Sequence, residues 1–82
     1  MEYIMAKIGS INNASMFKKL LQKRGFDAYV AHTPPSMNKG GCSYSVKFSS
    51  NIFDAVKRTA AENNIKIKGF YADKGGEYYD IS

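Results

Sequence analysis

The sequence predicts an α+β fold in which two helices cover one face of a four-stranded antiparallel sheet. Strand-like alternation and helix-like periodicity of apolar residues follow one another along the chain in the order βαββαβ. The chain has 82 residues, a length that suits one small hydrophobic core. We therefore expect a single domain spanning residues 1–82.

A strand and a helix are predicted first. Apolar residues alternate with other residues in positions 3–8, which is the period of a half-buried strand. They then recur at helical spacing in residues 14–24, with lysines and other polar residues on the opposite side. Ser10 or Asn12 is suited to cap the start of this helix. Gly25 is suited to end it in the left-handed conformation.

Two further strands, residues 27–32 and 43–48, are predicted on either side of a loop over residues 33–41. The first of them ends before Pro34 and Pro35, whose backbones cannot donate hydrogen bonds to a sheet. The second alternates strictly, as a strand with one solvated face does. Its predicted core-facing residues are Tyr44, Val46 and Phe48.

A second helix and a fourth strand complete the predicted pattern. Ser49 or Ser50 caps the helix, and Asn63 or Asn64 ends it. The strand covers residues 65–71, with its isoleucines facing the core and its lysines facing solvent. The predicted buried stripe of the helix is Ile52, Val56 and Ala60. This order of elements is that of a ferredoxin-like sandwich.

The C-terminal tail, residues 72–82, leaves one element open. Residues 73–76 have the composition of a turn, because they end in two glycines. Residues 77–81 could then return as an extra C-terminal strand, and the sequence favours neither outcome.

Several classes of function lack support in the sequence. One cysteine and one histidine provide neither an internal disulfide nor a zinc site, so no metal and no cofactor are expected. The glycine pairs lack Walker or Rossmann spacing. No acidic residue is spaced to orient the histidine for a serine nucleophile. The chain shows neither a signal-like N-terminus nor an apolar run of about 18 residues, which predicts a cytoplasmic protein without a membrane segment.

Cys42 is the only cysteine of the chain, and two glycines precede it. Gly40 and Gly41 leave the backbone free to turn its amides toward an anion, which favours thiolate over thiol. The predicted hairpin brings His32 opposite Cys42, where a protonated imidazole would lower the pKa of the thiol. The alternative is that Cys42 is a small buried apolar residue and that its contact with His32 is coincidental.

The segment around this cysteine resembles a known family. Its most specific part is Thr33-Pro34, followed by a short polar loop and Gly41-Cys42 before the strand of residues 43–48. Over residues 3 to about 71 the chain is similar to the small selenium/sulfur carrier-like proteins. Members typically have a basic residue after Thr-Pro and a glycine after the cysteine, where this chain has Pro35 and Ser43.

The resemblance implies a carrier more than an enzyme. In that role Cys42 holds sulfur or selenium as a persulfide or selenosulfide, and His32 is the candidate partner of the thiolate. The partners would be donor and acceptor proteins that bring and receive the cargo. The loop residues that would surround the thiol are Thr33, Pro34, Gly40, Gly41 and Ser43.

The sheet face opposite the helices suggests two other functions. The net charge of +5 could indicate a nucleic-acid partner, although lysines also serve simply as solvent-exposed residues. The face could bind single-stranded nucleic acid. Alternatively, it could bind a second copy of the chain through an apolar patch. Residues predicted to lie away from the helices are Tyr3, Met5, Lys7, Tyr29, Lys47, Lys66, Lys68 and Phe70.

Overall fold

The computed structural model of the chain describes residues 2–33 and 43–81. These residues form five strands, two α-helices and one turn of 3₁₀ helix. In chain order the elements are β1 (Tyr3–Gly9), α1 (Ile11–Lys23), β2 (Ala28–His32), β3 (Tyr44–Ser49), η1 (Ser50–Ile52), α2 (Phe53–Glu62), β4 (Gly69–Lys74) and β5 (Glu77–Asp80). The α+β class and the order βαββαβ are confirmed, with one strand added at the end.

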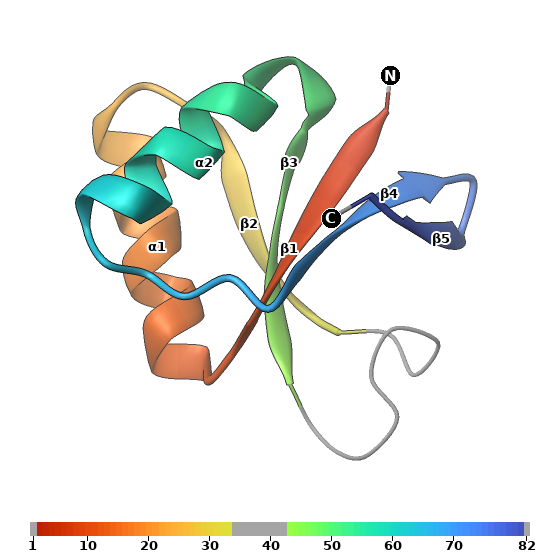
Figure 1. The fold of residues 1–82 in the computed structure, drawn as a ribbon, viewed down its shortest axis with the longest axis horizontal. Helices are drawn as coiled ribbons and strands as arrows, with labels where there is room; N and C mark the ends of the chain where they lie inside the picture. The colour runs from red at the N-terminus through yellow and green to blue at the C-terminus, as the bar shows by residue number, and fades with distance from the viewer. Residues whose placement is uncertain (1, 34–42, 82) are drawn as a thin grey trace.

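The sheet is antiparallel throughout and has the strand order β2-β3-β1-β4-β5. It therefore has five strands, not the four that we predicted for the core of the fold. The fifth is the C-terminal strand that the sequence left open, and it pairs with β4 at the edge far from the helices (Figure 1). Both helices lie on one side of the sheet (Figure 1). Helix α1 packs on β2 and β3, and Phe53 of α2 contacts Phe48 of β3 and Phe70 of β4.

Helix α1 begins and ends as its flanking residues predict. The side chain of Ser10 accepts a hydrogen bond of 3.2 Å from the backbone N–H of Asn13, so Ser10 is the cap and Asn12 lies inside the helix. At the other end Gly25 has a φ of +85°, the left-handed conformation in which glycine avoids the strain of a Cβ.

The start of the second helix differs from the prediction. Neither Ser49 nor Ser50 caps α2 with its side chain, because the 3₁₀ turn η1 begins at Ser50 and the residue before α2 is Ile52. The end is as predicted: Asn63 follows the last helical residue, and Asn64 takes a left-handed φ of 54°.

The fourth strand is the largest departure in element boundaries. It covers Gly69–Lys74, whereas residues 65–68 form an extended link without strand pairing. The two isoleucines of this link are half-buried against the core and its two lysines are exposed, so the link has the burial pattern of a strand. A backbone hydrogen bond of 2.7 Å from the N–H of Lys68 to the carbonyl of Lys7 ties the link to β1.

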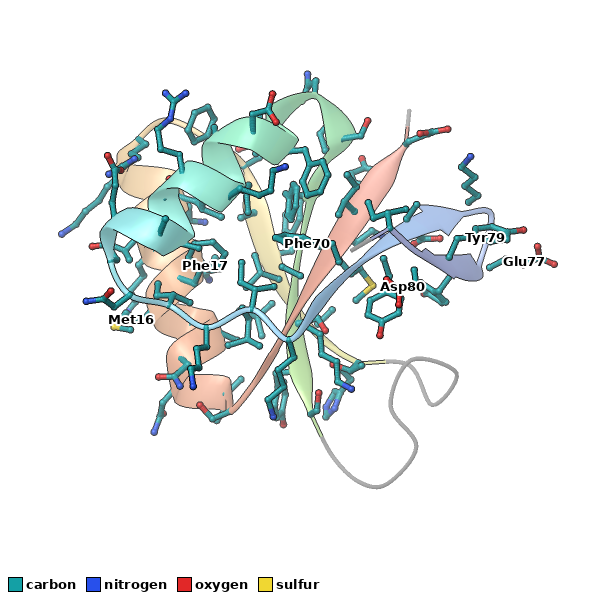
Figure 2. All side chains as sticks on the ribbon, in the orientation of Figure 1. Met16, Phe17, Phe70, Glu77, Tyr79 and Asp80 are labelled. Carbon is teal, nitrogen blue, oxygen red and sulfur yellow. The ribbon has the colours of Figure 1, made fainter. Side chains whose placement is uncertain are left out.

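The core lies between the helices and the sheet. Ile4, Ala6 and Ile8 of β1 face it, as predicted, and meet a stripe of side chains from both helices. Phe17 of α1 is completely buried there, and Phe17 and Phe70 both lie between helices and sheet in Figure 2. The other fully buried apolar side chains that define this core include Leu21, Val46, Phe48 and Val56.

Strand β5 carries a tyrosine whose phenol is hydrogen-bonded to a carboxylate of the same strand. The phenol of Tyr79 donates a hydrogen bond of 2.5 Å to a carboxylate oxygen of Glu77, and both lie at the edge of the sheet in Figure 2. Because the neutral phenol is the donor, this bond raises the pKa of Tyr79 above its ordinary value of 10.0. The pair therefore favours the folded state below pH 10, and that contribution disappears as the pH rises through the raised pKa.

We expect Glu77→Gln to return the pKa of Tyr79 toward 10.0, because the negatively charged acceptor is removed. Ultraviolet absorbance titrations of the wild type and of Tyr79→Phe, subtracted from one another, isolate the ionisation of this one phenol. The same subtraction in the Glu77→Gln background should show a lower midpoint. Equal midpoints in the two backgrounds would contradict the role of Glu77.

Candidate functional site

Three hydroxyl groups meet where β2 and β3 leave the sheet at either side of residues 34–42. Ser43 donates a hydrogen bond of 2.7 Å to Thr33 Oγ1, and Thr33 Oγ1 and Ser45 Oγ share another of 2.6 Å. The backbone N–H of Thr33 also donates to the carbonyl of Ser43, at 2.9 Å. We call these three residues the hydroxyl cluster. It joins the two ends of the described chain on either side of residues 34–42, the part of the sequence that contains Cys42.

The hydroxyl cluster is buried although it lies on the sheet face opposite the helices. Ser45 falls between two strand residues that pack toward the core, so its own side chain points to the other face. Ser45 is completely inaccessible, and Thr33 and Ser43 are each 8% exposed. Within residues 2–33 and 43–81, every buried side-chain oxygen or nitrogen has a hydrogen-bond partner. The cluster is therefore satisfied internally.

His32 pairs with a different residue from the one that we predicted. Its Cα partner across the hairpin is Tyr44, and the centroids of the two rings lie 4.5 Å apart. Tyr44, not Cys42, is therefore the residue directly opposite His32 in the register, and the predicted contact of His32 with Cys42 lies outside the described residues. The imidazole is nevertheless exposed at the end of β2. Its role as a partner of the thiolate stays a prediction.

The remaining candidate residues of the loop are Pro34, Gly40, Gly41 and Cys42, and they lie outside the described residues. Of the residues predicted to surround the thiol, the structure therefore places Thr33 and Ser43, and it brings their side chains together.

Ser45 is the member of the cluster that we did not predict. Strict alternation correctly placed it on the face away from the helices, where a small polar residue is unremarkable. The sequence nevertheless contained a signal for the cluster, because Thr33, Ser43 and Ser45 each lie within two positions of the facing ends of the predicted strands 27–32 and 43–48. In an antiparallel register Thr33 lies beside Ser43, and Ser45 is its diagonal neighbour.

The sheet face away from the helices is less open than predicted. The ammonium of Lys47 lies 3.2 Å from a carboxylate oxygen of Asp73 and 4.8 Å from the ring centroid of Tyr3. Met5 is only 2% exposed. Phe70 was predicted on this face but packs on the opposite one, with its ring centroid 4.9 Å from that of Phe53 in α2.

Two further observations limit the chemistry of the described residues. Within residues 2–33 and 43–81, His, Cys, Asp and Glu side chains form no group of three that could hold a metal ion. No helix in this part of the chain is long and apolar enough to cross a membrane.

These features define a small α+β domain with one antiparallel sheet, two helices on one face, and a hydroxyl-bonded hairpin base next to the only cysteine. The family described as "Putative Se/S carrier protein-like" matches residues 3–72, and the chain belongs to this family. The resemblance seen in the sequence is thereby confirmed. No curated protein compared with the chain matches it.

Proposed function

We propose that this protein carries selenium or sulfur on the thiol of Cys42, held on a ferredoxin-like scaffold. The observation that supports this most directly is that the family match over residues 3–72 includes a single cysteine. A carrier needs one nucleophilic atom that accepts and releases the cargo, and thiolates are the side-chain groups suited to this exchange. A disulfide reductase would instead need a second, resolving cysteine, which the sequence lacks.

The proposed loading step is an exchange between a thiolate and a persulfide. The Cys42 thiolate attacks the outer sulfur of a donor persulfide, so that a new S–S bond forms as the donor's S–S bond breaks. The donor leaves as a thiolate, and the carrier becomes a persulfide. A thiolate of the acceptor protein then attacks the outer sulfur and regenerates the Cys42 thiolate. No outside oxidant or reductant is consumed, and a selenosulfide donor would follow the same balance.

The described residues support this proposal through the ends of the loop. The hydroxyl cluster and the Thr33–Ser43 backbone bond hold together the two residues that flank positions 34–42, and Ser43 is the sequence neighbour of Cys42. His32 is exposed at the same end of the hairpin, so a protonated imidazole could favour the thiolate there. We therefore retain His32 as the proposed partner of the thiolate.

The two alternative functions receive less support. Lys47 is already paired with Asp73, and Phe70 points into the core, so the face offers fewer free cations and aromatic rings for nucleic acid than we predicted. The apolar patch proposed for a homodimer is also smaller than predicted, because Met5 is buried. Tyr29 of this patch is 59% exposed.

Intact-mass analysis of the protein isolated from its host without reductant tests the carrier function. We expect a fraction whose mass is higher by one sulfur or one selenium, and we expect dithiothreitol to remove the addition. Cys42→Ser should show no such fraction. An unmodified wild type, or the same addition on Cys42→Ser, would contradict the proposal.

A relocated thiol is the matched control for nonspecific modification. The double variant Cys42→Ser, Met16→Cys carries one cysteine at a position on α1 that is 49% exposed. If the loop environment matters, this variant should be isolated without the added sulfur or selenium. Equal loading of the relocated thiol would show that any exposed cysteine suffices.

A further inference from the structure

A surface pocket of about 500 Å³ lies at the end of β1, where Gly9 pairs with Tyr44 of β3. The end of β1, the first turns of α1 and the link from α2 to β4 surround it. Figure 2 shows Met16 projecting from α1 near the start of this link. The side chains that give the pocket its chemical character are Asn13, Met16, Asn63, Asn64, Lys66 and Lys68.

The charge that lines the pocket is entirely positive. Lys66 and Lys68 contribute their side chains, and no aspartate or glutamate is among the lining residues. The ion pairs seen in residues 2–33 and 43–81 involve other cations, so neither lysine is neutralised by a carboxylate there. Two cations that share one concave surface repel each other, and an anion bound between them would relieve that repulsion.

The position of Lys68 depends on a glycine. The backbone N–H of Lys68 donates a hydrogen bond of 2.7 Å to the carbonyl of Lys7, and its ammonium lies close to Gly9. A Cβ on residue 9 would be 3.3 Å from the Lys68 Nζ, and the φ of Gly9 is +116°. The missing side chain thus leaves space for the ammonium beside the backbone at the end of β1. The hydroxyl of Ser10 already caps α1, so the lysines are the source of the attraction here.

The other lining residues indicate the rest of the ligand. Ile8, Ile65 and the 49% exposed Met16 form an apolar wall, which suits a short hydrocarbon or aromatic group. Carboxamides at Asn13 and Asn64 can donate hydrogen bonds to oxygen atoms. We propose that this pocket binds a small organic phosphate monoester, with its phosphate between Lys66 and Lys68 and its apolar group against Met16.

NMR titration of the full chain with phenyl phosphate tests the proposal. We expect saturable shifts of backbone amides around the pocket, including those of Gly9, Asn64 and Lys68. Removing either cation, in Lys66→Ala or Lys68→Ala, should weaken binding about tenfold, because each loses one charge-assisted contact to the phosphate. Lys23→Ala, which removes an equal charge from the far end of α1, is the matched control and should bind as the wild type does.

Three results would overturn the proposal. One is the absence of saturable shifts with phenyl phosphate at millimolar concentration. Another is equal weakening by Lys23→Ala, which would indicate a nonspecific effect of net charge. The third is equal affinity for benzyl alcohol, which would indicate an apolar pocket without anion selectivity. Cys42→Ser should bind phenyl phosphate like the wild type, so that the outcome here is independent of the carrier function.

Discussion

Phe17→Ala is expected to lower the free energy of unfolding by about 3–5 kcal/mol, which is the usual cost of truncating a buried phenylalanine. Phe17 is completely buried, and it projects from α1 into the cluster that joins both helices to the sheet (Figure 2). Its removal leaves a cavity in a core whose neighbours come from different elements. The neighbouring side chains can fill this cavity only partly, because each of them is held in place by its own helix or strand.

The effect is large relative to the stability of the whole domain. Native domains are stabilised by about 0.05–0.15 kcal/mol per residue, or roughly 4–12 kcal/mol for a chain of this length. The loss of one ring should therefore remove about a quarter of the total or more. We expect the midpoint of urea unfolding, followed by circular dichroism, to fall sharply or the folded baseline to disappear.

Met16→Ala is the matched control for this experiment. Met16 is the neighbouring residue on the same helix, but 49% of it is exposed. Its replacement should change the free energy of unfolding by less than about 1 kcal/mol, because little apolar surface leaves the core and alanine favours a helix. Similar losses in the two variants would contradict the assignment of Phe17 to the core.

Thr33→Val is expected to cost about 1–3 kcal/mol, since it removes the hydroxyl to which both serines of the hydroxyl cluster bond. Valine keeps the shape of threonine, so the cavity term is small. The hydroxyls of Ser43 and Ser45 would remain buried without this partner. For a domain of this size each kcal/mol corresponds to about 4–8 °C in Tm, so the change is measurable by thermal unfolding.

Thr33→Ser is the control that distinguishes the contribution of the Thr33 hydroxyl from that of its methyl group. It keeps the oxygen that accepts from Ser43 and loses only a methyl group. We expect its Tm to lie much closer to that of the wild type than the Tm of Thr33→Val. If the two variants were equally destabilised, the methyl group, not the hydrogen bonds, would account for the loss.

Local patterns were sufficient where the residues that decide the structure are neighbours in the chain. The alternation of Ile4, Ala6 and Ile8 predicted the core face of β1, and Ser10 and Gly25 predicted the ends of α1. These features depend on backbone geometry and on side chains within one turn of helix or one strand. They can therefore be recognised before any tertiary contact is known.

The face on which Phe70 lies could not be predicted in this way. We extended the alternation of Ile65 and Ile67 along the chain, which would place Phe70 on the opposite face. In the structure the strand begins only at Gly69, and both Phe70 and the isoleucines pack toward the core. A one-residue change in phase reverses every later side chain, and only pairing with β1 sets that phase.

The sequence by itself determined the α+β class, the order βαββαβ of the first four strands and the two α-helices, the family resemblance and the cysteine on which the proposed function depends. The tertiary structure decided the fifth strand, the register of β4, the ring contact of His32 with Tyr44, and the meeting of Thr33, Ser43 and Ser45. The physical reason is the range of the forces involved. Propensity and periodicity act within a segment, whereas strand pairing and hydroxyl contacts depend on residues that only the folded chain brings together.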